Sequence, residues 1–220
     1  MTRTNFIKIT LLFAVGVFIS GCGIPELPLD NKIVKIREQD YVLNYPQKIP
    51  AGELDLIFLI TPGGSENEAN GMIELWRPYL IKNSLAAASV IDWQQDKLKK
   101  VLTDLQQKYK FRKIFVTGFS NGGYNSCYFA SLNPDLTDGI IPMGAYCSHS
   151  DTLTLPKVPI LAVNGEKDTW ARGDDLKSVT KASRDLKAHG INQEEMLIPG
   201  LGHEYPVSAL PRVIEWIKSH

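Results

Sequence analysis

Lys113-Ile114-Phe115-Val116-Thr117-Gly118-Phe119-Ser120-Asn121-Gly122 is the stretch that decides the fold of this 220-residue chain. Its first half is an apolar run that predicts a buried strand over 113–117, and residues 122–132 favour a helix. The pattern G-x-S-x-G, centred on Ser120, stands at the turn between them. A serine on so sharp a turn has a strained backbone and an exposed hydroxyl, and glycine on either side avoids collisions with the strand and the helix. This context makes Ser120 a candidate nucleophile.

Outward from this stretch, apolar strands alternate with amphipathic helices. Strands are expected at 54–60, 86–91, 139–143, 158–163 and 195–198, and helices at 70–82, 94–109, 176–189 and 209–218. Two short strands at 33–37 and 41–45 are expected to form an antiparallel edge. Continuous apolar strands separated by helices indicate a mostly parallel central sheet covered by helices on both faces. The predicted fold class is therefore α/β.

The first 21 residues have the composition of an export signal. Arg3 and Lys8 precede an apolar run over 9–19 that is too short to span a bilayer, and the run ends directly before Cys22. This end resembles the bacterial lipoprotein signal, in which small residues precede a cysteine that is lipidated and becomes the mature N-terminus. An ordinary signal peptide followed by an incidental cysteine is the alternative.

The expected organisation is a signal peptide over 1–21, a tether over 22–31 and a single domain over 32–220. Lipidation of Cys22 would make the membrane a partner and would anchor the domain to the bacterial cell envelope. Gly23 follows Cys22, where lipoproteins retained in the inner membrane carry Asp, so the outer membrane is favoured.

Composition argues against several classes of partner and cofactor. The chain has 24 Lys and Arg residues against 24 Asp and Glu, with no long basic run, so nucleic-acid binding has no support. No cluster of His, Cys, Asp and Glu has the spacing of metal ligands, and no metal or cofactor is expected. Besides Cys22 the chain contains Cys127 and Cys147. They could form a disulfide in an exported protein or remain buried thiols.

An acid and a histidine follow two later strands. A serine hydroxyl needs a base that takes its proton and a third group that orients the base. Asp168 lies in Asn164-Gly165-Glu166-Lys167-Asp168, directly after the strand at 158–163. His203 lies in Gly200-Leu201-Gly202-His203, after the strand at 195–198. The order along the chain is Ser, Asp, His.

Other residues compete for these two roles. Asp151 could supply the carboxylate from the loop after the preceding strand, and we favour Asp168. His149 precedes the acid in the sequence, His189 is explained as a residue at a helix C-terminus, and His220 is the last residue. His203 is therefore the expected base.

The Ser120 elbow, the Gly165-x-x-Asp168 turn and the Gly202-His203 loop resemble the α/β-hydrolase superfamily over nearly the whole domain. The resemblance implies that Ser120 is the nucleophile, that His203 acts as base and then acid, and that Asp168 fixes the imidazole tautomer. Asp40 to Pro46 and Phe119 to Gly123 are most similar to small secreted esterases of the polyhydroxybutyrate depolymerase and feruloyl esterase type. The phospholipase/carboxylesterase family is nearly as similar.

The loop after the strand at 54–60 departs from the family pattern. Relatives carry His-Gly-Gly there, and this chain has Thr61-Pro62-Gly63-Gly64. Backbone N–H groups do not depend on the missing histidine. Gly64 and Asn121 are therefore expected to form the oxyanion hole.

Several features bear on the substrate. Trp170 lies two residues after Asp168 and is expected to contact substrate, while Asp92 and Trp93 could line the pocket or serve as ordinary strand-end residues. The connection from Gly144 to Lys157 has no room for a large lid. We therefore expect an open site for short-chain or bulky polar esters, with a small-molecule ester as substrate. The alternatives are a serine peptidase of the prolyl oligopeptidase type and a non-catalytic surface lipoprotein.

Overall fold

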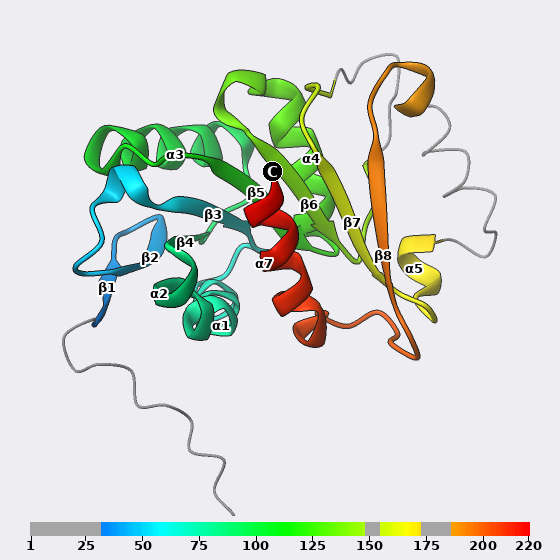
Figure 1. Ribbon diagram of the computed structural model, residues 1–220, viewed down its shortest axis with the longest axis horizontal. Helices are drawn as coiled ribbons and strands as arrows, with labels where there is room; N and C mark the ends of the chain where they lie inside the picture. Colours follow the sequence, from blue (N-terminus) through cyan, green and yellow to red (C-terminus); the bar gives the residue numbers. More distant parts are fainter. Residues whose placement is uncertain (1–31, 148–154, 173–185) are drawn as a thin grey trace, which may run out of the picture.

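The computed structural model describes residues 32–147, 155–172 and 186–220, which form an eight-stranded sheet between two layers of helices (Figure 1). The strand order across the sheet is β1-β2-β4-β3-β5-β6-β7-β8. β1 is antiparallel to β2 and β2 to β4, and all other neighbours are parallel. The strands are β1 (Ile33–Arg37), β2 (Tyr41–Pro46), β3 (Asp55–Ile60), β4 (Leu85–Val90), β5 (Ile114–Phe119), β6 (Gly139–Met143), β7 (Ile160–Gly165) and β8 (Gln193–Ile198). The predicted α/β class and the antiparallel edge are both confirmed.

Alternate residues of the central strands build two cores. Ile57 and Leu59 of β3 face a core shared with α1 and α7, whereas Phe58 and Ile60 face a core shared with α3 and α4. This follows from the two-residue period of a strand, which sends successive side chains to opposite faces. The helices are α1 (Glu66–Trp76), α2 (Leu80–Asn83), α3 (Gln95–Tyr109), α4 (Asn121–Leu132), α5 (Thr169–Arg172) and α7 (Leu210–Ser219). The sheet is thus covered on both faces, as its apolar strands predict.

The largest departure from the expected elements is the helix predicted over 70–82. α1 starts earlier, at Glu66, because Ser65 caps it, and the helical run is interrupted by a 3₁₀ turn at Arg77–Tyr79 before α2. Pro78 at the start of that turn explains the break, since proline cannot donate to the preceding helical turn. The short helix α5 was not expected. Most of the helix predicted over 176–189 lies outside the described residues, although 186–188 are helical.

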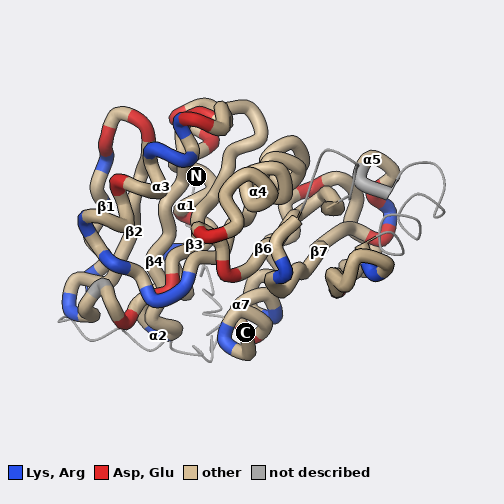
Figure 2. The backbone as a smooth tube through the Cα atoms, turned by 90° about the horizontal axis from the view of Figure 1, so that it is seen from above, with Lys and Arg blue, Asp and Glu red and all other residues tan. Residues whose placement is uncertain are grey.

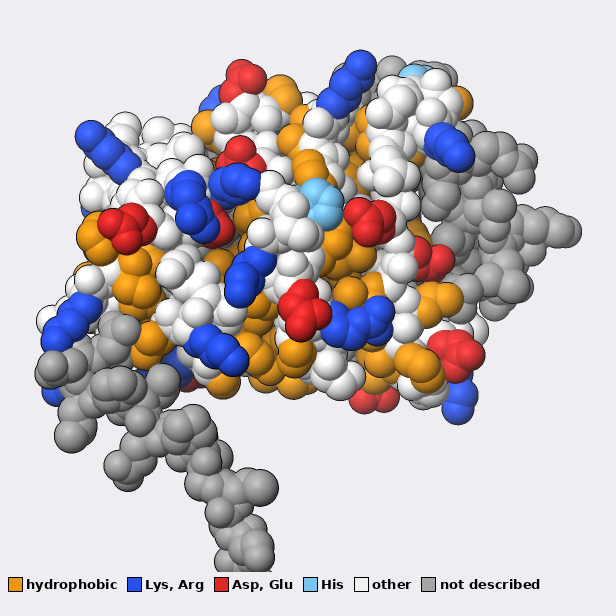
Figure 3. All heavy atoms as spheres, in the orientation of Figure 1, with side chains coloured by type: hydrophobic (Ala, Val, Ile, Leu, Met, Phe, Trp, Pro, Cys, Tyr) orange, Lys and Arg blue, Asp and Glu red, His pale blue; other side chains and the backbone are white. Residues whose placement is uncertain are grey.

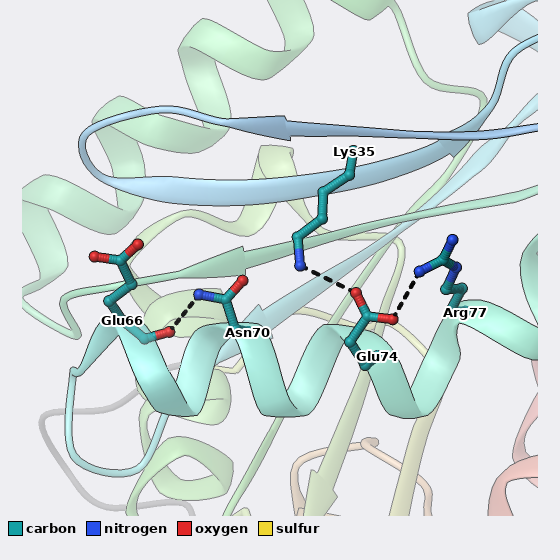
Figure 4. A network of polar contacts seen from close by, with 5 residues as sticks. All are labelled: Lys35, Glu66, Asn70, Glu74 and Arg77. Carbon is teal, nitrogen blue, oxygen red and sulfur yellow. Dashed lines mark hydrogen bonds and ion pairs between the residues drawn. The ribbon is translucent and has the colours of Figure 1, made fainter.

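Ion pairs join the outer face of α1 to the antiparallel edge (Figure 4). Lys35 Nζ of β1 lies 3.0 Å from Glu74 Oε1, and Arg77 Nη1 lies 3.1 Å from the other oxygen of the same carboxylate. Asn70 donates from its side chain to the Glu66 carbonyl at 3.0 Å. Partial burial raises the pKa of Glu74, but the hydrogen bonds from Lys35 and Arg77 outweigh this and leave the pKa below its usual value.

Charged residues lie mainly outside the sheet. Figure 2 shows uncharged backbone along β6 and β7, with charged residues in the surrounding loops and helices. On the face that carries α7, side chains of both signs are interspersed (Figure 3). Across the ranges that the structure describes, no helix combines the length and apolar character required to cross a membrane. The predicted signal peptide, Cys22 and the tether precede these ranges.

A disulfide between Cys127 and Cys147 joins α4 to the segment after β6. Both residues are buried in a small core with Ile140 and Ile160. The bond fixes the helix that starts beside Ser120 to the neighbouring strand end, and the sequence alone had left this pairing open.

Candidate active site

Ser120 stands on the turn between β5 and α4 with φ 54° and ψ −118°. A positive φ is uncommon for a residue with a side chain and is found where the surrounding structure enforces it. Here the Ser120 N–H donates to the Met143 carbonyl at the end of β6, at 2.8 Å. The elbow is therefore held by the neighbouring strand.

The two glycines of the elbow are required by close backbone contacts. A Cβ on Gly118 would lie 2.5 Å from the Gly122 carbonyl and from the Ile60 carbonyl oxygen. A Cβ on Gly122 would overlap the same Ile60 oxygen of β3. The sequence prediction that side chains at these positions would collide is confirmed by this packing.

The three residues expected in the triad lie within hydrogen-bond distance of one another. His203 Nε2 is 2.8 Å from Ser120 Oγ, and His203 Nδ1 is 2.8 Å from Asp168 Oδ2. Asp168 is 2% exposed, while the His203 side chain is 26% exposed. A buried carboxylate on Nδ1 favours the tautomer that leaves Nε2 free to accept a proton from the serine hydroxyl. The geometry suits general-base activation of Ser120.

Backbone hydrogen bonds hold the acid turn against the histidine loop. Lys167 N–H donates to the Leu201 carbonyl at 2.8 Å, and Gly200 N–H donates to the Glu166 carboxylate at 3.0 Å. Gly165 approaches the Leu201 and Gly202 carbonyls so closely that a Cβ there would overlap both. The loops after β7 and β8 thus form one unit that sets the distance between Asp168 and His203.

Two aromatic rings lie close to the His203 imidazole. The Phe119 ring centroid is 5.0 Å from that of His203, and Trp170 is 6.1 Å from it. Phe119 in turn lies 5.8 Å from Tyr205, whose hydroxyl accepts a 2.9 Å hydrogen bond from Trp76. Burial raises the pKa of Tyr205, so this tyrosine remains neutral.

The loop Thr61-Pro62-Gly63-Gly64 lies beside the start of α4. Asn121 Nδ2 donates to the Pro62 carbonyl at 3.1 Å, and the Thr61 hydroxyl donates to the Val90 carbonyl at 3.2 Å. Gly64 has φ 71°, which glycine adopts readily. Among the described residues, neither the Gly64 N–H nor the Asn121 N–H donates to a protein acceptor. One of these donors directly follows Ser120, and the other lies on the loop that the Asn121 side chain binds, which is consistent with the predicted oxyanion hole.

Trp170 and Trp93 both expose their rings to solvent. Trp170 is 83% exposed on α5, and Trp93 is 42% exposed. A Cβ on Gly64 would lie 3.0 Å from Trp93 Cδ1, so Trp93 packs on the loop over 61–64. Asp92 instead forms an ion pair with Lys97 at 2.5 Å, which gives it a local role at the start of α3.

The competing residues either lie elsewhere or fall outside the described ranges. His220 stacks on Trp216 at the end of α7, with ring centroids 4.4 Å apart. His189 is part of the turn that follows the helical residues 186–188. His149 and Asp151 belong to a part of the chain that the structure does not describe. Within the part that it does describe, no three His, Cys, Asp or Glu side chains are arranged to hold a metal ion.

Sequence reasoning missed three side chains at the site, namely Glu68, Phe119 and Tyr205. Ser65-x-x-Glu68 is a capping-box pattern and could have been found from the sequence. Nothing in the sequence indicates that Tyr205 would lie near Phe119, because that contact depends on how the histidine loop returns to the sheet.

Comparison with known proteins finds relatives that are similar to parts of this chain. Residues 64–135 match a family described as alpha/beta hydrolase of unknown function (DUF915), a range that includes Gly64, Ser120 and Asn121. The chain is 28% identical over 115 residues to the protein usf of Aquifex pyrophilus, covering 50% of this chain and 48% of that protein. It is 25% identical over 131 residues to a Yersinia pestis protein named provisionally as a carboxymethylenebutenolidase, with the same shares covered. The chain thus spans about half the length of the curated relatives it matches.

Solved structures resemble the chain over most of its length. An S-formylglutathione hydrolase from Staphylococcus aureus superposes with a TM-score of 0.64 at 16% identity, covering 85% of this chain and 95% of that one. At 16% sequence identity, this similarity shows a shared fold and nothing about activity. The chain therefore has the α/β-hydrolase fold, with a mostly parallel sheet and a strained serine elbow after β5.

Proposed function

We propose that the protein is a serine hydrolase that cleaves carboxylic esters through an acyl-enzyme. The observation that carries the proposal is the chain of two 2.8 Å contacts from Ser120 Oγ through His203 to buried Asp168. The resemblance in fold to an S-formylglutathione hydrolase and the name of the Yersinia pestis relative support hydrolysis of an acyl bond.

The proposed reaction has two halves. Ser120 Oγ attacks the ester carbonyl while its proton passes to His203 Nε2, and the N–H groups of Gly64 and Asn121 stabilise the oxyanion. The intermediate collapses, His203 returns the proton to the leaving alcohol, and the acyl group remains on Ser120. A water molecule, deprotonated by His203, then attacks the acyl-enzyme and releases the carboxylic acid and free Ser120.

The partial exposure of His203 suggests which esters fit. His203 is partly open to solvent, Trp170 offers a large aromatic surface beside it, and Trp93 offers another beside Gly64. Short acyl chains, or bulky polar esters that approach from solvent, suit such a site better than long acyl chains, which need a covered apolar groove.

The test compares purified wild-type protein with Ser120→Ala and His203→Ala on nitrophenyl acetate and with a fluorophosphonate probe. Each substitution should lower kcat by roughly a millionfold, because the triad acts as a unit. Ser120→Ala should also abolish labelling. Ser131→Ala is the matched control, since among the described residues its hydroxyl bonds only to the Tyr128 carbonyl on the same helix. Near-normal hydrolysis by Ser120→Ala protein would refute the assignment.

Two other outcomes would favour the alternative functions. A wild-type protein that is inactive and is not labelled by the probe would favour a non-catalytic lipoprotein. A wild-type protein that cleaves peptides faster than esters would favour a serine peptidase.

We also propose that lipidated Cys22 anchors the domain to the cell envelope, with the outer membrane favoured. The sequence around Cys22 is the support for this second proposal. Cys22→Ser should release the domain from membranes or leave an unprocessed precursor, as judged by fractionation without detergent. Unchanged membrane attachment would count against lipidation.

A further inference from the structure

We infer that Glu68 is the positioning residue of the oxyanion loop and that it determines which glycine of that loop faces the reacting carbonyl. The inference rests on the proposed function, because it assigns a role in the same site. It concerns the loop in which Pro62 replaces the histidine of related sequences.

The Glu68 carboxylate binds the loop directly from the first turn of α1. Glu68 Oε2 accepts hydrogen bonds from the Gly63 N–H at 3.1 Å and from the Ser65 N–H at 3.2 Å. The Ser65 hydroxyl in turn accepts from the Glu68 N–H at 3.3 Å, which completes a capping box. The usual capping box satisfies only the N-cap and N3 amides, and the bond to Gly63 extends it two residues back into the loop.

The bond to Gly63 limits which amide can reach the substrate. Pro62 has no N–H, so Gly63 and Gly64 supply the two consecutive donors of the loop. Because the Gly63 N–H is directed to Glu68, the Gly64 N–H is the one left free among the described residues. Two successive glycines are otherwise flexible, and a flip of one peptide plane would turn the free donor away.

Two further side chains, Asn121 and Trp93, help to hold the loop over 61–64 in place. Asn121 Nδ2 holds the Pro62 carbonyl at 3.1 Å, and Trp93 packs against Gly64. Glu68 therefore links the loop to α1 by side-chain hydrogen bonds, while Asn121 links it to α4. Donors held in place before the reaction stabilise a developing oxyanion far better than donors that must reorganise.

The test uses Glu68→Ala, Glu68→Gln and Ser65→Ala in the full-length chain. Loss of one oxyanion donor costs about a hundredfold to a thousandfold in kcat, and a donor that is only misplaced should cost roughly ten- to a hundredfold. Glu68→Ala should show this loss in kcat on nitrophenyl acetate with little change in KM. Glu68→Gln keeps an acceptor oxygen and should restore most of the activity. Ser65→Ala removes the cap of α1 but leaves the bond to Gly63, so it should lower stability without the loss in kcat.

Amide hydrogen exchange, followed by NMR, gives a readout that does not require turnover. The Gly63 amide should be protected in wild-type and Ser65→Ala protein and should lose protection in Glu68→Ala, while the Gly64 amide should exchange rapidly in all three. Full kcat in Glu68→Ala, a change in KM alone, or an unprotected Gly63 in wild-type protein would overturn the inference. An inactive wild-type protein with a protected Gly63 would refute the proposed ester hydrolysis and leave the positioning supported.

Discussion

At the scale of the residue, the site is defined by side chains and amides that the backbone holds in place. Ser120 has a strained backbone because Gly118 and Gly122 let β3, β5 and α4 approach closely. The His203 ring lies near the rings of Phe119 and Trp170, with centroids 5.0 and 6.1 Å away. Phe119 is partly buried, whereas Trp170 is 83% exposed and therefore available to a substrate.

Trp170→Ala should weaken binding of esters that carry an aromatic or other bulky group. An aromatic contact contributes about 0.5–1.5 kcal/mol, so KM for such esters should rise roughly three- to tenfold, with little change for acetate esters. Trp170→Phe, which keeps a ring, serves as the control. Steady-state kinetics on matched small and bulky nitrophenyl esters would check this. An equal loss of kcat on both esters would mean instead that Trp170 orients His203.

At the scale of the element, α1 is joined to two other parts of the molecule. Its first turn binds the loop over 61–64 through Glu68, and its outer face is joined to β1 through Glu74 and Lys35. The antiparallel edge of the sheet is thus fastened to the helix that positions the loop. The link is solvent-exposed, since the Glu74 and Lys35 side chains are each 40% exposed, and exposed ion pairs contribute little.

Glu74→Gln should destabilise the domain by less than about 1 kcal/mol at neutral pH. The pKa of Glu74 in the folded protein lies below its usual 4.5, so its contribution is fully present above pH 4.5 and is lost as the pH falls through the lower folded value. Denaturant unfolding of the wild-type and Glu74→Gln proteins would be measured at pH 7 and in acid. The difference between their free energies of unfolding should disappear in acid. Glu215→Gln, which removes an exposed carboxylate on α7, is the control. A difference that persists unchanged in acid would contradict the ion-pair explanation.

At the scale of the whole molecule, the sheet order brings distant segments to one edge. β5, β7 and β8 are parallel, so the turns that follow them carry Ser120, Asp168 and His203 to the same side. The disulfide between Cys127 and Cys147 adds a covalent link between α4 and the segment after β6. It restrains the same part of the molecule in which Ser120 bonds to Met143.

Replacing both Cys127 and Cys147 by Ala should lower the free energy of unfolding by about 3 kcal/mol, as expected for a cross-link that closes a loop of this size. The two residues are 20 apart in the sequence. Guanidinium unfolding with and without reductant would measure the effect, and reductant should destabilise only the wild-type protein. Equal stability of both proteins under oxidising conditions would contradict the prediction. Below the unfolding transition kcat should be retained, because the triad contacts do not involve the cysteines.

The sequence by itself determined the features that depend on local sterics and periodicity. Apolar runs such as 54–60 and 139–143 specified buried parallel strands, and the glycines around Ser120 specified a sharp turn, because each signal lies within a few residues. The order of Ser120, Asp168 and His203, each after a strand, was enough to predict that they would meet.

Only the tertiary structure decided the contacts between segments that are far apart in the chain. The Cys127–Cys147 pairing, the packing of Trp93 on Gly64 and the stacking of Phe119 on His203 each depend on which strands are neighbours and on where the loops turn back. The role of Glu68 is intermediate, since its capping box is a local pattern but its bond to Gly63 depends on the path of the loop. Sequence periodicity indicates which face of an element is buried, whereas the distance between two loops is set only when the whole sheet has formed.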